Sequence, residues 1–290
     1  MSIRWVTVFF DLPAGSFDAG VAFWRAVTGY GLSAPRGTDG EFATLLPPSG
    51  DAYLRVQRIR EGAGGCHLDL HIDTEAETLD AAADRAQGAG ALIRTAEPGL
   101  VVAESPGGFP FCLTGWDGER VIPPPLAAVV AATGRADRAD SDEAGGTSTA
   151  GGTDTVSGTG GVDPTSGSGA SGGASRVDTL CLDAPPADFE RELAFWAALT
   201  GCATRPAPVP GYAVLKGPAS WPARILLQRR DSAVPGDRVR AHVDFGCTDT
   251  GALDRHVSLG AHVVATLQYW TVLTDPAGHE YCLVNRSPAG

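Results

Sequence analysis

The sequence predicts an α+β protein made of two copies of one domain, joined by a flexible linker. A length of 290 residues suits about two domains. Short patterns in the first half recur in the second half, in the same order and at nearly the same spacing. A stretch of small polar residues separates the halves. The predicted boundaries are 1–127 for the first domain, 128–175 for the linker and 176–288 for the second domain.

The duplication is supported by four pairs of matching segments. They include an aromatic helix pattern ending in Thr-Gly, a strand carrying His-x-Asp and a segment ending in aromatic-Cys-Leu. Such a repeat identifies the structural unit before any single element is assigned. The pairs are 17–31 with 189–203, 54–58 with 225–229, 66–73 with 241–248, and 105–115 with 275–285.

The linker is predicted from composition. From Gly134 to Ser175 the chain is dominated by Gly, Ser, Thr, Ala and Asp, with almost no large apolar side chain. Such a segment cannot bury enough apolar surface to offset the entropy lost on ordering. We therefore expect a disordered spacer between the two domains.

Each copy is predicted to contain the order β-α-β-β-β twice. In the first copy, residues 4–12 are rich in β-branched and aromatic residues, which is typical of a strand. A helix should follow, because Ser16 can cap its start, Gly29 can end it, and apolar residues recur at helical spacing. Further strands are expected over 41–48 and 52–59, with room for one short extra strand in this first half. A strand over 66–73, a helix over 75–90 and strands over 91–97, 99–105 and 109–115 should follow.

These patterns together resemble the vicinal oxygen chelate superfamily. Its members include glyoxalase-like proteins, bleomycin-resistance proteins and extradiol dioxygenases. The resemblance covers nearly everything outside the linker. It implies two tandem glyoxalase-like domains, each with two βαβββ units that form a curved mixed sheet around a cavity. It also implies that a small organic molecule binds in the cavity of each domain.

Strand alternation indicates which side chains face the cavity. In residues 66–73 the leucines and isoleucine share one face, while His67 and Asp69 share the other. His242 and Asp244 repeat this arrangement in the second copy. Because the pKa of histidine lies near neutrality, His67 and His242 are candidate general bases.

The resemblance implies four cavity positions per domain, which in metal-binding members hold His, Glu or Gln. Here the set is Thr, Gln, His and Cys, of which only His is a strong donor to a divalent ion. The sequence therefore favours a degenerate metal site and no cofactor, with iron, manganese, nickel or zinc as the alternative. The four positions are Thr7, Gln57, His67 and Cys112 in the first domain, and Thr179, Gln228, His242 and Cys282 in the second.

Glu280 is a further candidate in the second domain, where it could act in catalysis or bind a metal together with His242. The first domain has Pro110 at the matching position and lacks this carboxylate. Trp5, Phe9 and Trp270 could provide stacking surface for a ligand, and Asp69 and Asp244 could bind its polar groups. The structural alternative is that both cysteines are small buried side chains and that the Asp69 carboxylate pairs with Arg55.

Composition excludes several functions. The net charge of −12 argues against binding to nucleic acid or to an anionic membrane surface. No apolar run is long enough for a spanning helix, and the N-terminus lacks the pattern of a signal peptide. The six scattered cysteines predict no disulfide framework, and a cytoplasmic protein is expected. Four βαβββ units in one chain allow an intramolecular pseudo-dimer, as a monomer or within a homodimer.

Three functions remain open from the sequence. The first is a metal-free protein that binds a small molecule in each cavity. The second is a divalent-metal-dependent lyase, isomerase or dioxygenase that uses the second domain. The third is a protein in which one copy has become a scaffold for the other. The fold alone does not choose among them, because one fold can host many chemistries.

Overall fold

The computed structural model describes residues 2–127, 173–234 and 236–289. Most of the predicted linker, residues 128–172, lies outside the described residues. Ala174 and Ser175, which the prediction assigned to the linker, begin strand β10. In the described part of the chain, no helix is long and apolar enough to cross a membrane.

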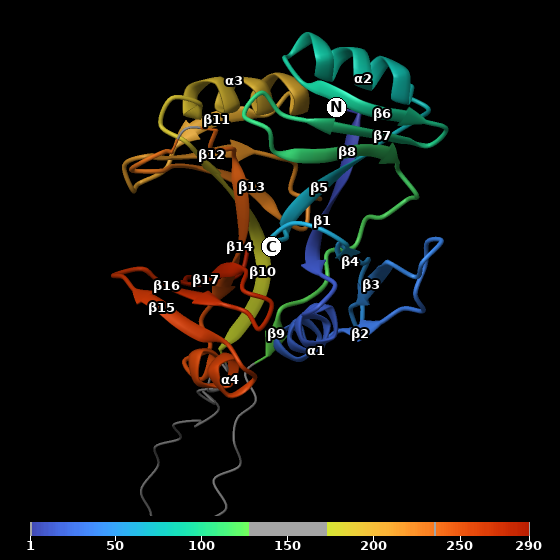
Figure 1. Cartoon of the computed structure of the whole chain (residues 1–290). Helices are drawn as coiled ribbons and strands as arrows, with labels where there is room; N and C mark the ends of the chain where they lie inside the picture. Colours follow the sequence, from blue (N-terminus) through green and yellow to red (C-terminus); the bar gives the residue numbers. More distant parts are fainter. Residues whose placement is uncertain (1, 128–172, 235, 290) are drawn as a thin grey trace, which may run out of the picture. The chain divides into compact units, whose positions relative to one another are not determined.

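The first copy forms an eight-stranded mixed sheet with strand order β2-β3-β4-β1-β5-β8-β7-β6 (Figure 1). Strand β1 lies at its centre, parallel to β4 and antiparallel to β5. The βαβββ pattern occurs twice, as predicted, and β2 is the short extra strand. The elements are β1 Ile3–Pro13, α1 Phe17–Thr28, β2 Gly31–Leu32, β3 Phe42–Leu46, β4 Leu54–Ile59, β5 Gly65–Ile72, α2 Leu79–Gly88, β6 Leu92–Glu97, β7 Leu100–Glu104 and β8 Pro110–Gly115.

The second copy repeats this topology with the order β11-β12-β13-β10-β14-β17-β16-β15. A short strand, β9 (Leu126–Ala127), pairs with the start of β10. The α+β prediction with two tandem copies is thus confirmed. The elements are β10 Ala174–Ala184, α3 Phe189–Thr200, β11 Ala203–Pro206, β12 Tyr212–Lys216, β13 Arg224–Arg229, β14 Arg240–Cys247, α4 Ala252–Ser258, β15 His262–Thr266, β16 Trp270–Thr274 and β17 Glu280–Asn285.

Helix ends follow local chemistry, with two differences from the prediction. Gly29 ends α1 in the left-handed region, with φ of 71°, as the sequence indicates. Ser16 occupies the N-cap position, but its hydroxyl accepts no hydrogen bond from a helix N–H. Helix α2 begins at Leu79 rather than near residue 75, because the Thr78 side chain caps the N–H of Ala81 at 3.2 Å.

Tryptophans on two helices connect the copies. In α1, the Trp24 Nε1–H donates to Asp275 Oδ2 of the second copy at 2.8 Å. The Trp24 ring also lies parallel to Phe245 of β14, with ring centroids 6.2 Å apart. In α3, Trp196 packs edge-on against Phe111 of β8 in the first copy, at 5.4 Å between centroids. Each copy therefore contributes a helix to the hydrophobic core of the other.

The carboxylate that accepts from the tryptophan sits in a different place in each copy. Trp196 Nε1–H donates to Glu192 Oε2, one turn earlier in the same helix, at 3.0 Å. Glu192 also accepts from the backbone N–H of Gly107 in the first copy. Its counterpart in α1 is Gly20, while the counterpart of Asp275 is Ser105. One buried carboxylate per helix is retained, although its position in the chain has changed. Burial raises the pKa of Glu192 above its ordinary value.

We expect Asp275→Ala to lower the free energy of unfolding by about 2–4 kcal/mol. The change would leave Trp24 Nε1–H and the backbone N–H groups of Ala277 and His279 without their acceptor. Urea unfolding followed by tryptophan fluorescence measures the loss. The matched control is Asp254→Ala, because Asp254 is an exposed carboxylate on α4. Equal stability of the two variants would contradict a structural role for the Asp275 bonds.

Candidate functional site

A histidine–aspartate pair occurs at the same place in both copies. In the first copy, His67 Nδ1 on β5 lies 2.8 Å from Asp11 Oδ2 on β1. In the second, His242 Nδ1 on β14 lies 2.7 Å from Asp183 Oδ2 on β10. The bond crosses two adjacent antiparallel strands, on the face that strand alternation assigns to the cavity.

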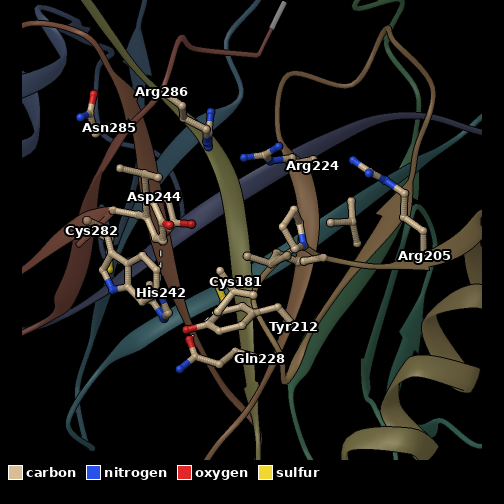
Figure 2. A pocket seen from close by; sticks show the side chains of 18 residues that line it. Cys181, Arg205, Tyr212, Arg224, Gln228, His242, Asp244, Cys282, Asn285 and Arg286 are labelled. Carbon is tan, nitrogen blue, oxygen red and sulfur yellow. Dashed lines mark hydrogen bonds and ion pairs between the residues drawn. The ribbon is translucent and has the colours of Figure 1, made fainter. Parts of the chain in front are cut away.

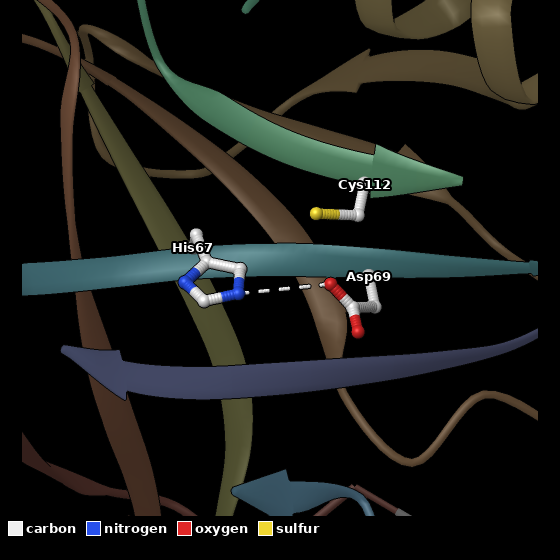
Figure 3. A group of neighbouring side chains, drawn as sticks. All are labelled: His67, Asp69 and Cys112. Atoms are coloured by element: carbon white, nitrogen blue, oxygen red, sulfur yellow. Dashed lines mark ion pairs between the residues drawn. The ribbon is translucent and has the colours of Figure 1, made fainter. Parts of the chain in front are cut away.

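A second carboxylate lies on the other side of each imidazole. His67 Nε2 is 3.7 Å from Asp69 Oδ1, and His242 Nε2 is 3.3 Å from Asp244 Oδ1 (Figure 3). Each ring is thus held between two aspartates, one on its own strand and one on the neighbouring strand. This arrangement fixes the ring orientation and favours the doubly protonated imidazolium.

The pKa values of the two histidines follow from this environment. Burial disfavours the charged ring of His67, but the hydrogen bond and charge of Asp11, with the charge of Asp69, outweigh it and raise its pKa. Burial likewise opposes the charge on His242. There the charge of Asp183 and the hydrogen bonds to the Asp183 and Asp244 carboxylates raise the pKa well above its ordinary value. Both rings should therefore hold their second proton to a higher pH than free histidine.

A cysteine completes a group of three potential metal donors in each copy. Donor atoms of His67, Asp69 and Cys112 lie within 4.8 Å of one another (Figure 3). His242, Asp244 and Cys282 form the equivalent group in the second copy, and Cys181, Asp183 and His242 form another beside it. Burial raises the pKa of Cys112 and of Cys282, so without a bound cation both thiols should stay protonated near neutral pH.

The second copy encloses a cavity of about 450 Å³ around His242 (Figure 2). This volume falls within the range of small-molecule sites. Its wall is largely apolar and includes Val214, Leu226 and Trp270. Polar side chains line the cavity in three groups. The first is His242 with Asp244 and Cys282, which together with Asp183 we call the His242 cluster. The second is Gln228 with Tyr212, and the third is three arginines. An apolar wall with a few convergent polar groups is typical of a ligand site.

One residue differs decisively between the copies beside the histidine. Opposite His67, β1 carries Phe9, whose ring stacks on the imidazole with centroids 4.3 Å apart. Opposite His242, β10 carries Cys181. The phenylalanine occupies space next to the histidine that in the second copy belongs to the cavity lined by Cys181. The two imidazoles are similarly exposed, 12% for His67 and 14% for His242, so the copies differ in the groups beside the ring.

Most of the residues predicted for the second copy come together. Gln228, His242, Asp244, Trp270 and Cys282 all line the cavity. The other two predicted residues differ. The buried Thr179 lies behind the wall, where its hydroxyl accepts hydrogen bonds from Arg224 and Arg286. Glu280 is exposed at the start of β17 and belongs neither to the cavity lining nor to the donor group of His242.

The predicted residues of the first copy fall into two groups. His67, Asp69 and Cys112 meet in the donor group, and Phe9 stacks on His67. Asp69 also lies 3.9 Å from Arg55, as the structural alternative proposed. The remaining three residues do not join the donor group. Trp5 is fully buried. The Thr7 hydroxyl is hydrogen-bonded to His71 at 2.8 Å. Gln57 lies opposite Asp11 in the backbone register of β4 and β1.

The sequence analysis missed the aspartates that hold the histidines. Asp11 and Asp183 occupy the same position in the two copies, each four residues after the threonine predicted on the first strand. Their recurrence, on the same strand face as Thr7 and Thr179, was a usable signal. It was missed because the resemblance pointed to only one cavity position on that strand. Cys181 and the arginines of the cavity were not predicted either.

Comparison with known proteins agrees with this architecture. A family model described as "Glyoxalase-like domain" matches residues 7–114 and 179–284. A search of curated protein sequences returned no match. The solved structures that resemble the chain include a glyoxalase, a catechol 2,3-dioxygenase and an extradiol ring-cleaving dioxygenase, enzymes of the kinds that the vicinal oxygen chelate superfamily contains.

Three of these structures illustrate the likeness. The Mn(II)-bound glyoxalase from Novosphingobium aromaticivorans is 16% identical, with a TM-score of 0.55 over 99% of this chain and 84% of that one. A trihydroxybiphenyl dioxygenase from Sphingomonas wittichii is 13% identical, with a TM-score of 0.56 over 98% and 90%. The dioxygenase LapB from Pseudomonas sp. KL28 is 11% identical, with a TM-score of 0.58 over 98% and 92%. Identities this low demonstrate a shared fold only.

We expect Asp183→Asn to lower the pKa of His242, because the substitution removes the carboxylate charge at Nδ1. NMR titration of the histidine ring protons in chelator-treated protein measures the shift. The unfolded chain has an ordinary histidine pKa of 6.5. The bound proton therefore stabilises the wild-type fold fully below that pH, and this stabilisation is lost as pH rises through the raised folded-state value. The control is Asp231→Asn, at an exposed position, which should leave the pKa of His242 unchanged. An unchanged His242 titration in Asp183→Asn would rule out the pairing.

Proposed function

This chain belongs to the family of glyoxalase-like domains, and we propose that it binds a small organic molecule in the cavity of its second copy, beside His242. The observation that carries the proposal is the apolar cavity of about 450 Å³ that the His242 cluster adjoins. The sequence predicted a binding cavity in each domain. The geometry favours the second, because Cys181 leaves open the space that Phe9 occupies in the first.

The cluster defines what His242 can do for a bound molecule. Asp183 holds Nδ1, so the ring presents Nε2 toward Asp244 and the cavity. With its raised pKa, the imidazolium can donate the Nε2 proton as a hydrogen bond to a ligand oxygen. If that oxygen gains negative charge in a reaction, the same proton can be transferred to it, and His242 then acts as a general acid. Asp183 stabilises the charged ring before this transfer and can accept a hydrogen bond from Nδ1–H of the neutral ring after it.

A divalent-metal enzyme is the second candidate, and the donor group supports it. His242 Nε2, Asp244 and Cys282 supply one imidazole, one carboxylate and one thiol, a set that suits zinc and leaves room for further ligands. Asp183 would orient the ring through Nδ1, as carboxylates commonly do behind metal-bound histidines. When bound, such an ion would polarise a substrate oxygen. Binding requires loss of protons from His242 and Cys282, so affinity should rise with pH.

We expect the wild-type chain to bind one equivalent of the neutral apolar dye N-phenylnaphthylamine (NPN), with increased dye fluorescence. Cys181→Phe places in the second copy the side chain that fills the first, and should weaken binding by about tenfold or more. Phe9→Cys makes the reverse change in the first copy and should leave this binding within about twofold.

Two controls separate binding from misfolding. Circular dichroism and urea unfolding of Cys181→Phe establish whether the variant is folded. Direct binding of NPN to Trp270→Ala and Leu226→Ala, which shorten apolar wall residues, tests the same cavity without filling it. Undiminished NPN binding by a folded Cys181→Phe would refute the second-copy cavity as the site.

For the metal alternative, we expect zinc or manganese to be retained at one equivalent after gel filtration and lost in His242→Ala. Glu280→Gln is the matched control, because Glu280 was predicted as a ligand but lies outside the donor group. Elemental analysis of the wild type and both variants measures retention, at two pH values. If no ion is retained after loading with iron, manganese, nickel or zinc, the metal alternative is wrong.

A further inference from the structure

We propose that the molecule bound in the second-copy cavity carries an anionic group, which is held by Arg224 with help from Arg205. This inference rests on the proposed function and narrows its ligand class to organic anions with an apolar body. Three arginines, Arg205, Arg224 and Arg286, line the cavity. Figure 2 shows their side chains on the opposite side of the view from Gln228 and His242.

Arg286 is already neutralised by the protein. Its guanidinium makes two hydrogen bonds of 2.5 Å to Asp178, whose side chain is fully buried. Asp178 sits at an irregularity in β10. A side chain at Gly246 would collide with both members of this pair, so the glycine makes room for it. The pair forms one fixed part of the cavity wall, and it supplies no free positive charge.

Arg224 has no such partner. Its Nε–H donates to Thr179 Oγ1 at 2.8 Å, and this is the only hydrogen bond of the Arg224 side chain within the described residues. It forms no ion pair there, although the side chain is half-buried. Burial, reinforced by the charge of Arg286, lowers the pKa of Arg224, and the charges of Asp178 and Asp244 offset this only in part. A partly buried cation without a counterion is costly, and a carboxylate or phosphate on a ligand would remove that cost.

Arg205 adds a second positive charge at the cavity entrance. It is exposed, lines the cavity and forms no ion pair within the described part of the chain. The chain as a whole carries a net charge of −12. A local excess of arginine inside a cavity is therefore not expected from composition, and it favours anionic ligands electrostatically.

The first copy serves as an internal comparison. Register alignment of the two sheets places Tyr53 at the position of Arg224 and Trp116 at that of Arg286. Tyr53 is fully buried and donates its hydroxyl to the Val177 carbonyl. The first copy thus has no arginine at the positions of Arg224 and Arg286. Its arginine on this face is Arg55, at the position of Leu226, which lies over the Phe9 ring and pairs with Asp69.

The layout also suggests how a ligand would lie. Its anionic group would meet Arg224, its apolar body would contact Leu226, Val214 and Trp270, and its other end would approach His242. Arg224 and Leu226 are alternate residues of the same strand, so both project to the cavity face. An aromatic or aliphatic organic acid fits these three requirements together.

The test compares NPN with anilinonaphthalene sulfonate (ANS), a dye of similar body that bears an anionic group. We expect the wild-type chain to bind ANS at least about tenfold more tightly than NPN. Arg224→Gln should remove most of this preference while leaving NPN affinity within about twofold. Arg205→Gln should have a smaller effect in the same direction, and added salt should weaken ANS but not NPN. Arg25→Gln, at an exposed position on α1, is the control for net charge.

The outcomes distinguish failure of the anionic subsite from failure of the cavity as a binding site. If NPN binds but ANS is not preferred, or if a folded Arg224→Gln keeps the preference, the anionic subsite is wrong and the cavity proposal stands. If neither dye binds the wild-type chain, the cavity proposal fails and the subsite with it. If ANS is preferred as expected, its displacement by naphthoate or by naphthyl phosphate identifies which anion the arginines hold. Displacement by neither compound would count against an organic anion.

Discussion

The antiparallel register between the first and fifth strands of each copy determines the rest of the site. In the second copy it places Cys181 opposite His242, with Asp183 two residues further along β10 and hydrogen-bonded to the same ring. Because side chains alternate between faces, a slip of one residue would turn these groups into the apolar core. The same register in the first copy produces the Asp11–His67 pair. The polar cluster is therefore a property of the shared fold.

The copies differ in what surrounds that shared cluster. A ring at Phe9 covers His67, while Cys181 leaves the space beside His242 free. Tyr53 in one copy ties the two halves together, and Arg224 in the other faces a cavity. Stabilising contacts thus stand at these two positions of the first copy, although its His67, Asp69 and Cys112 donor group is retained.

At the interface between the copies, each copy packs part of its core against the other. Trp24 and Trp196 each place an indole in the core next to the other copy, and each indole N–H meets a buried carboxylate. Glu192 provides that carboxylate from the helix in one case, and Asp275 provides it from the loop before β17 in the other. A buried N–H needs an acceptor, so the acceptor persists even though its sequence position has changed.

The sequence by itself determined the duplication, the repeated βαβββ order and the face on which His67, Asp69, His242 and Asp244 lie. These features depend on local spacing and on comparison of the two halves. Only the tertiary structure decided that Asp183 holds His242, that Glu280 is exposed, and that the second cavity is open and lined by arginines. Asp183 and His242 are 59 residues apart. Their contact depends on strand register and side-chain packing, which no local pattern specifies.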